Sequence, residues 1–390
     1  MTDAVRTPVI RPLSTLAASL LLLAAAVDEL CSAAPTVGAP DLRADLSMSV
    51  TAVYVFGTVL PLLAALVIEP ALVWLSDGPR RRAILLGSGV CWSLGYGICA
   101  SAGSPWVLSV GLAVVFVAAG VALAVARSGL VAGSAEVERV LVRWTLAGAL
   151  GDLLGPLALA GLGMLGGGWR AGMAGCALAV GLWVAGAVAV PLERADEDEI
   201  DEEGTPWGAL RDPLLVGWLL GVSLCTLLDE IFVAGVALYA VDVLGTGLPG
   251  AGLLVACEMS GAVIGLWAFE RMGAPRAGLV PACVLSLVGL AAAVAAPVAP
   301  LAGLALFVCG LGNGPQYPLA LSAAHRALPG HPGRVEALKN VFTPLDLVFP
   351  LAFGVLADHA GLGVALVALG LQPAGLVAIR AWSGSRSASR

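Results

Sequence analysis

Gly151-Asp-Leu-Leu-Gly-Pro-Leu157 is the stretch that decides the fold. It places a carboxylate, Asp152, about one turn before a Gly-Pro pair inside an apolar run. The pattern returns 194 residues later as Leu345-Asp-Leu-Val-Phe-Pro-Leu351, and six of twelve aligned positions (151–162 against 345–356) are identical. The chain therefore contains an internal repeat, and each copy carries an acid within an apolar segment.

The composition indicates a polytopic membrane protein. Hydrophobic residues make up 59% of the 390 residues and charged residues 12%, about half the charge of a soluble domain. Many apolar runs exceed the ~20 residues that cross a bilayer, which argues against two soluble domains. The 50 glycines suit close helix packing in lipid. The eight cysteines lie in apolar runs without a CxxC spacing, so we expect small core residues rather than disulfides or a metal cluster.

The apolar runs predict an all-α membrane protein with twelve transmembrane helices in two six-helix bundles. The predicted helices cover residues 13–39, 50–75, 83–100, 106–126, 144–165, 171–190, 214–241, 251–269, 278–298, 301–323, 337–357 and 361–378. An acidic segment separates the two sets of six. We therefore predict an N-terminal bundle over 1–192, an acidic cytoplasmic linker over 193–212 and a C-terminal bundle over 213–390, with Pro213 opening the seventh helix.

The positions of Lys and Arg predict the orientation. With the N-terminus in the cytoplasm, 18 of the 20 cationic residues fall on the cytoplasmic side. Only Arg43 and Arg170 fall on the other side. This asymmetry follows the positive-inside rule and supports an even number of helices with both termini in the cytoplasm.

Further alignments relate the two halves. The Asp28-Glu29 pair of the first helix matches the Asp229-Glu230 pair of the seventh, 201 residues later. The ends of the second and eighth helices match at an offset of 193, and the fifth and eleventh helices at 194. Two halves in the same orientation form a parallel repeat, which is typical of secondary transporters with a site between the halves.

Three motifs resemble those of the Major Facilitator Superfamily, and with the repeat the resemblance covers essentially the whole chain. Asp77-Gly-Pro-Arg-Arg-Arg82 resembles its helix 2–3 loop signature, and Gly151-x-x-x-Gly155-Pro156 resembles the helix 5 signature of its twelve-helix drug:proton antiporters. Pro40-x-Leu-x-x-Asp45-Leu-x-x-Ser49 resembles the helix 1–2 loop of the same group. The chain departs from the pattern at Leu72, where the loop signature begins with Gly, and at Phe116, where the antiporters carry Arg four residues before a Gly.

The resemblance implies a cavity lined by helices 1, 4, 7 and 10, walls from helices 2, 5, 8 and 11, and lipid contact for helices 3, 6, 9 and 12. It also implies a gating role for residues at the cytoplasmic helix ends and in the helix 5 motif. These are Asp77, Arg80, Arg81, Arg82, Gly151, Gly155, Pro156, Glu270 and Arg271. Positive-inside topology alone is the alternative explanation for the arginines.

Eight carboxylates lie within the apolar runs: Asp28, Glu29, Glu69, Asp152, Asp229, Glu230, Glu258 and Asp346. Each charged acid facing lipid would cost roughly 2.5–3.5 kcal/mol, so they must be protonated, paired or in contact with water. No Lys or Arg lies well inside a predicted helix, and no acid lies in helices 3, 6, 9 or 12. At ~1.5 Å per residue, Asp28 lies ~22 Å, and Asp152 and Asp346 ~12–14 Å, from the cytoplasmic ends of their helices.

The repeated acids favour a binding function over isolated structural acids bonded to a neighbouring helix. Because Asp28 and Glu29 point ~100° apart, we expect one to face the cavity. Neighbouring carboxyls disfavour each other's ionisation, so some should hold protons near neutral pH. In the tenth helix, Asn313-Gly-Pro-Gln-Tyr-Pro318 should break the helix and offer Asn313, Gln316 and Tyr317 to the cavity, unless it is only a packing kink.

The sequence thus predicts a secondary active transporter of the bacterial cytoplasmic membrane that exports a cationic substrate in exchange for protons by alternating access. Alternatives remain open: a divalent metal-ion carrier using the same acids, a proton-coupled importer, or a non-transporting receptor or scaffold. We expect no enzymatic activity and no cofactor, and the absence of a GxxxxGK[ST] loop argues against ATP as the energy source. The expected partners are a small cation or metal ion, protons and lipid, with no nucleic acid, for a monomeric protein.

Overall fold

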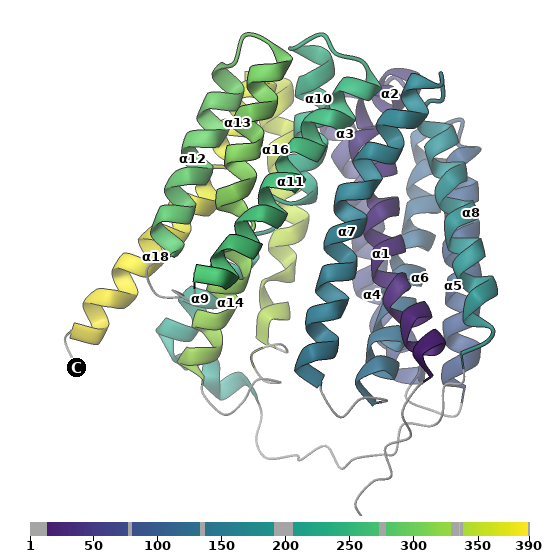
Figure 1. Ribbon diagram of the computed structural model, residues 1–390, viewed down its shortest axis with the longest axis horizontal. Coiled ribbons are helices and arrows are strands. Elements are labelled where there is room, and N and C mark those ends of the chain that lie inside the picture. The colour runs from purple at the N-terminus through teal and green to yellow at the C-terminus, as the bar shows by residue number, and fades with distance from the viewer. Residues whose placement is uncertain are drawn as a thin grey trace, which may run out of the picture.

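The computed structural model describes residues 14–76, 80–132, 137–190, 206–272, 278–328, 335 and 338–388. Within these ranges the fold is entirely helical (Figure 1). The first half contains α1 (Thr15–Val37), α2 (Ala39–Asp45), α3 (Val50–Tyr54), the π-helix η1 (Val55–Val59), α4 (Leu60–Ser76), α5 (Arg81–Ala100), α6 (Pro105–Ala132), α7 (Val137–Met164) and α8 (Trp169–Ala187).

The second half begins with the 3₁₀-helix η2 (Pro206–Arg211) and continues through shorter pieces. These are α9 (Pro213–Leu224), α10 (Glu230–Asp242), α11 (Leu248–Met272), α12 (Leu279–Ala295), α13 (Ala299–Asn313), α14 (Gln316–Ala327), the 3₁₀-helix η3 (Asn340–Phe342), α16 (Thr343–Ala360), α17 (Leu362–Ala368) and α18 (Leu371–Ala388).

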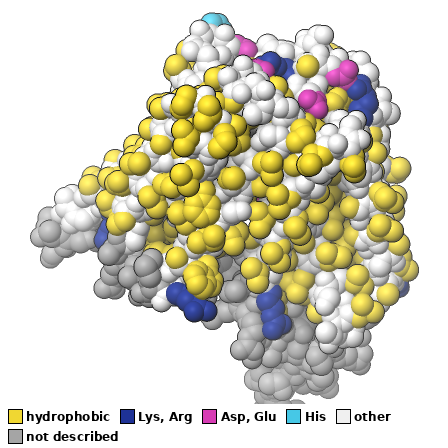
Figure 2. All heavy atoms as spheres, turned by 45° about the horizontal axis from the view of Figure 1, so that its top comes forward, with side chains coloured by type: hydrophobic (Ala, Val, Ile, Leu, Met, Phe, Trp, Pro, Cys, Tyr) yellow, Lys and Arg dark blue, Asp and Glu magenta, His cyan; other side chains and the backbone are white. Residues whose placement is uncertain are grey.

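These pieces form the twelve predicted helices when consecutive segments are joined. Helix 2 is α3, η1 and α4; helix 7 is α9 and α10; helix 10 is α13 and α14; helix 12 is α17 and α18. Eight helical spans in the described part of the chain are long and apolar enough to cross a membrane. Figure 2 shows hydrophobic side chains over the side of the molecule and charged side chains towards its ends, as expected for a protein surrounded by lipid.

Local sequence explains where several helices begin. The Ser14 hydroxyl caps α1 by accepting a hydrogen bond from the Ala17 amide, and Ser49 caps α3 in the same way through the Ala52 amide. Asp212 caps α9, and Pro213 occupies its first turn as predicted.

Several helix boundaries differ from the sequence prediction; α6, for example, continues to Ala132 and α7 begins at Val137. The segment 40–49, predicted as a loop, contains α2, which begins with Pro40 in its first turn. Helix 7 was predicted to be continuous but is broken between Leu224 and Glu230. Helix 12 extends to Ala388 because its polar end continues the helix past the apolar run. Of the predicted linker, only residues 206–212 lie in the described part of the chain.

The two halves lie side by side and approach each other at the end that carries α2 (Figure 1). We call this end the α2 end. Glycines allow the closest approach: a Cβ at Gly252 of α11 would lie 2.6 Å from the Pro156 carbonyl oxygen of α7, and one at Gly354 of α16 would lie 2.7 Å from the Thr51 Cα of α3. The halves are therefore in backbone contact along α7–α11 and α3–α16.

Candidate functional site

The Gly151–Leu157 stretch packs α7 directly against α1. A Cβ at Gly151 would lie 2.3 Å from the Ala26 carbonyl oxygen, and one at Gly155 would lie 2.7 Å from the Leu30 carbonyl oxygen. A Cβ at Gly151 would also lie 2.9 Å from the Glu29 Cβ, so the adjacent Asp152 and Glu29 lie close together where α7 packs on α1. Both acids line the same central cavity.

Three adjoining cavities surround this pair, and shared lining residues connect them. The C-side cavity, about 300 Å³, is lined by Ala149, Asp152, Cys225, Thr226, Leu228, Asp229, Glu258, Met259, Ala262, Val263, Leu266, Asn313, Gly314, Tyr317 and Gln372. The central cavity, about 240 Å³, is lined by Glu29, Ser32, Ala33, Thr36, Asp152, Pro156, Asp229, Glu230, Val233, Val255 and Met259.

The N-side cavity, about 290 Å³, lies mainly among helices of the first half. Its lining includes Asp28, Glu29, Ser32, Thr36, Gly57, Thr58, Glu69, Tyr96, Phe116, Gly120 and Glu230. One wall is the π-helix η1, a helical distortion that is frequent at functional sites. The Glu69 carboxyl lies over Gly120, where a Cβ would come within 2.4 Å of its Oε2 atom.

Seven of the eight predicted acids line these cavities, and no described lining residue is Lys, Arg or His. Both members of the Asp28-Glu29 pair line the N-side cavity, whereas we expected only one to face a cavity. The lining of this cavity comes from α1, α3, η1, α4, α5, α6 and α10, so Asp28 and Glu29 face it together with residues of both halves. The cavities therefore carry carboxyl groups without basic side chains among their described lining residues, and they can hold protons or cations.

The break in helix 7 presents the second acid pair. Asp229 lies outside helical geometry, with φ −123° and ψ −130°, and precedes the first residue of α10. Its side chain lines the C-side and central cavities, whereas Glu230 lines the central and N-side cavities. Both side chains are exposed to cavity space although their neighbours Leu228 and Ile231 are buried.

The predicted break in helix 10 is present, and it supplies part of a polar network. Asn313 donates to the Leu228 carbonyl oxygen at 2.7 Å and to Glu258 Oε1 at 3.4 Å. Glu258 is only 2% exposed. Tyr317 lines the C-side cavity, but Gln316 is fully buried and bonds within the network instead.

Sequence reasoning missed Gln372 in helix 12, which accepts a hydrogen bond from the Leu228 amide at 2.8 Å. Helix 12 was expected to face lipid, yet Gln372 lines the C-side cavity and is 1% exposed. A single amide side chain within an apolar helix was the available signal, because such a group must find partners inside the protein.

Asp346 differs from its repeat partner Asp152 in its place along the helix. It lies in the first turn of α16, directly after the 3₁₀-helix η3, whereas Asp152 lies in the middle of α7. Asp346 does not line the three cavities, and its Oδ1 atom is buried without a hydrogen-bond partner.

The predicted gating residues are only partly described. Asp77 and the side chain of Glu270 lie outside the described residues. Arg81 donates to the Ser128 hydroxyl and Arg82 to the Val188 carbonyl oxygen, both within the first half, while Arg80 is exposed. Arg271 stacks over Trp267, 4.7 Å from the ring centroid. The Arg81 and Arg82 contacts therefore join segments within the first half, whereas the Arg271 contact lies within α11.

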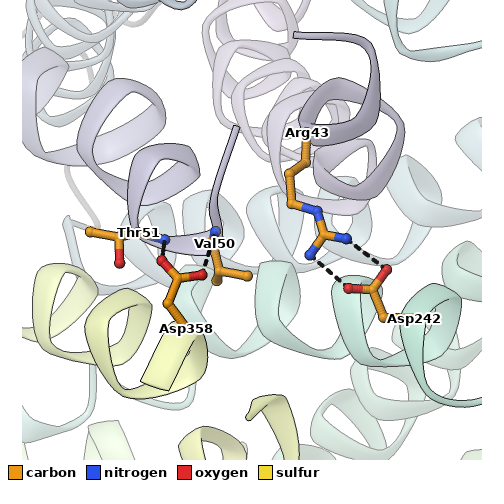
Figure 3. A network of polar contacts seen from close by, with 5 residues as sticks. All are labelled: Arg43, Val50, Thr51, Asp242 and Asp358. Carbon is orange, nitrogen blue, oxygen red and sulfur yellow. Dashed lines mark hydrogen bonds and ion pairs between the residues drawn. The ribbon is translucent and has the colours of Figure 1, made fainter. Parts of the chain in front are cut away.

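The contacts that join the two halves lie at the α2 end (Figure 3). Arg43 of α2 forms an ion pair with Asp242 at the end of α10, 2.6 Å between Nη1 and Oδ2. Asp358 of α16 accepts hydrogen bonds from the amides of Val50 and Thr51 at 2.9 and 2.8 Å. The Tyr54 hydroxyl donates to the Ile231 carbonyl oxygen at 2.9 Å. We call these contacts the α2-end latch.

No three His, Cys, Asp or Glu side chains of the described residues converge closely enough to hold a metal ion. The acids instead lie along the walls of the three cavities.

Comparison with known proteins defines the class. The described part of the chain has eight helical spans that are long and apolar enough to cross a membrane, and its fold matches those of solved transporter structures over almost its full length. The chain belongs to the Major Facilitator Superfamily, whose family model matches residues 21–345. The predicted family is therefore confirmed, as is the twelve-helix fold. None of the curated proteins compared matches the chain.

The structural relatives show the fold alone, because their sequence identities are low. An inward-facing, occupied structure of a bacterial homologue of the human lysosomal transporter Spinster has a TM-score of 0.76 at 14% identity, covering 94% of this chain and 96% of that one. The nucleoside transporter NupG has a TM-score of 0.73 at 10% identity, covering 94% and 99%.

Proposed function

We propose that this protein exports a cationic organic substrate in exchange for protons. The observation that carries the proposal is the series of three adjoining cavities lined by seven carboxyl groups and, among described residues, no basic side chain. A cation compensates this excess negative charge, and protons compensate it when the cation leaves. The competition couples the two flows.

The proposed site residues have distinct roles. Glu29 and Asp152 bind the exchanged proton, and Asp229 and Glu230 take part in binding the cation across the central cavity that all four line. Asp28 and Glu69 extend the site into the first half, and Glu258 with Asn313 and Tyr317 extends it into the second. Asp346, which lies outside the three cavities, acts from the margin of the site.

The α2-end latch suggests the conformational state. With both termini in the cytoplasm, as the Lys and Arg distribution predicts, the α2 end faces the outside of a bacterial cytoplasmic membrane. The halves are joined at that end by the α2-end latch. This supports an inward-facing state, from which a cytoplasmic cation can enter the cavities.

Purified protein in proteoliposomes with a pH-sensitive dye tests the proposal. Spermine, tetraphenylphosphonium, Mn²⁺ and the neutral nucleoside uridine are added in turn. We expect spermine to move protons and uridine to move none. Proton movement with Mn²⁺ alone would favour the metal carrier. Proton movement with uridine alone would overturn the cation proposal. Proton release by spermine in vesicles of the opposite orientation distinguishes export from import.

Variants test the residues. Asp152→Asn combined with Asp346→Asn should abolish spermine-driven proton movement. Asp41→Asn is the matched control, because Asp41 lies on α2 away from the three cavities. Unchanged flux in the double variant would overturn the site assignment.

A further inference from the structure

The break in helix 7 is held by side chains from other helices. The amides of Cys225, Thr226 and Leu227 bond to carbonyls three residues back, so the helix tightens before it ends. The next peptide leaves the helix. Its Leu228 amide donates to Gln372 Oε1 at 2.8 Å, and its carbonyl accepts from Asn313 Nδ2 at 2.7 Å. Two side-chain amides thus replace the helical hydrogen bonds of Leu228.

Gln372 is the centre of this network. Its Nε2 donates to Asn313 Oδ1 and to Gln316 Oε1, each at 3.0 Å. Gln316 in turn donates to the Gly312 carbonyl oxygen at 3.1 Å. Because Gln372 is 1% exposed, water cannot replace these partners in this conformation. Helices 7, 10 and 12 are therefore tied together at one residue, Leu228.

The acid pair itself does not cause the break. The same Asp-Glu sequence occurs in α1 as Asp28-Glu29, and α1 is continuous from Thr15 to Val37. Neither Gly nor Pro lies between Leu224 and Glu230. The difference between the two copies of the repeat therefore comes from the partners of Leu228.

We propose that Gln372 is a positioning residue for the Asp229-Glu230 pair: by holding the Leu228 peptide out of the helix, it directs the two carboxyl groups into the cavities. The inference rests on the proposed function, in which these acids bind the cation and the proton. Asn313 extends the network to a third acid, because its Nδ2 also reaches Glu258 Oε1.

Hydrogen–deuterium exchange tests the positioning without a substrate. The variants are Gln372→Leu and, as a control, Ser286→Ala, which removes another buried polar group that contacts Cys309. We expect exchange of peptides covering 225–231 to rise at least tenfold in Gln372→Leu and to stay unchanged in Ser286→Ala. Unchanged exchange in both variants, or an equal increase in both, would overturn the positioning role.

Spermine transport tests whether this positioning matters for function. Gln372→Leu should lower the maximal rate at least tenfold and change its pH profile, whereas Ser286→Ala should keep the wild-type profile. In Gln372→Glu, a protonated carboxyl can donate as the amide does. Its rate relative to wild type should therefore recover as pH falls. The titratable groups that line the same cavity are Asp152, Cys225, Asp229, Glu258 and Tyr317.

The outcomes separate the two proposals. If the wild-type protein moves no protons with spermine, the proposed function fails, and the exchange experiment still decides whether Gln372 holds the break. If wild-type transport is observed but Gln372→Leu keeps its rate and pH profile, the positioning role is overturned while the proposed function stands. Loss of rate without recovery of Gln372→Glu at low pH would also overturn it.

Discussion

Gly120 of α6 makes room for the Glu69 carboxyl of α4, since a Cβ at Gly120 would lie 2.4 Å from Glu69 Oε2. Both residues line the N-side cavity together with Phe116. Phe116 occupies the position at which the resembling antiporters carry Arg. In this chain an acid from helix 2, rather than a base from helix 4, therefore supplies the charge beside this glycine.

Gly120→Ala should displace the Glu69 side chain with little loss of stability. The atoms that the new methyl group meets belong to the end of a flexible side chain, so we expect a change in unfolding free energy of about 1 kcal/mol or less. Transport of spermine should fall about tenfold, which corresponds to 1.4 kcal/mol. Transport assays and thermal unfolding in detergent measure the two effects. Gly97→Ala in α5 is the control, because nothing lies within 4 Å of its Cβ position.

The α2-end latch should set the balance between conformations. Asp358→Asn removes the charge that accepts two amide hydrogen bonds across the halves, and we expect the population open at the α2 end to rise about tenfold, or 1.4 kcal/mol. Reaction of Cys225, which lines the C-side cavity, with an impermeant maleimide added from the α2 side measures this opening, with the site identified by mass spectrometry.

Asp212→Asn is the control for the latch, because the Asp212 side chain accepts from Leu214 within one half. It should lower stability without changing the labelling of Cys225. Equal labelling in Asp358→Asn and wild-type protein would contradict the role of the latch.

Gly310→Ala should be strongly destabilising. A Cβ at Gly310 of α13 would lie 2.0 Å from the Glu258 carbonyl oxygen of α11, and the backbone of a packed helix cannot move aside. We expect a loss of about 1–3 kcal/mol or more, as for other overpacked interiors. Gly303→Ala in the same helix is the control, since its nearest atom is a Leu254 methyl at 3.3 Å. Thermal unfolding of the two variants should differ by several degrees; similar midpoints would show that α11 and α13 can separate.

We expect Asp45 to make stability at the α2 end depend on pH to a limited extent. The hydrogen bond from Arg170 lowers the pKa of Asp45 below its ordinary value of 3.8, and one from Trp169 acts in the same direction. A depressed folded-state pKa contributes stability above the ordinary pKa, and this stability is lost as the pH falls through the folded value. Asp45→Asn should therefore reduce the dependence of the unfolding midpoint on pH below about 4. Because the carboxylate is exposed, salt should weaken the effect. Identical acid profiles for variant and wild type would contradict it.

The sequence predicted features that depend on local chemistry. Apolar run length placed the twelve helices, Pro213 marked the start of helix 7, and the Gly314-Pro315 pair marked the break in helix 10. The acid repeat identified most of the residues that line the cavities, because buried carboxylates without basic partners need water, protons or a ligand.

Features that depend on distant partners could not be predicted. The break at Leu228 has no local Gly or Pro signal, since its cause is Gln372, 144 residues away. The place of Asp346 in the first turn of α16 follows from the change of helix type at η3, for which hydropathy carries no signal. The α2-end latch joins residues about 200 to 300 positions apart, and only the packing of the halves brings them together.

The sparse α2-end latch has an energetic consequence for turnover. It consists of one surface ion pair, worth about 0–1 kcal/mol, two amide bonds to a carboxylate at about 1.5–3 kcal/mol each, and one tyrosine bond at about 1 kcal/mol. Opening the α2 end also makes new contacts at the opposite end, so the net difference between states is smaller than this total. A ligand shifts such an equilibrium by its difference in affinity for the two states. Under the proposed function, the difference in affinity for one cation or for protons is what shifts this equilibrium, so the gate itself needs no separate energy source.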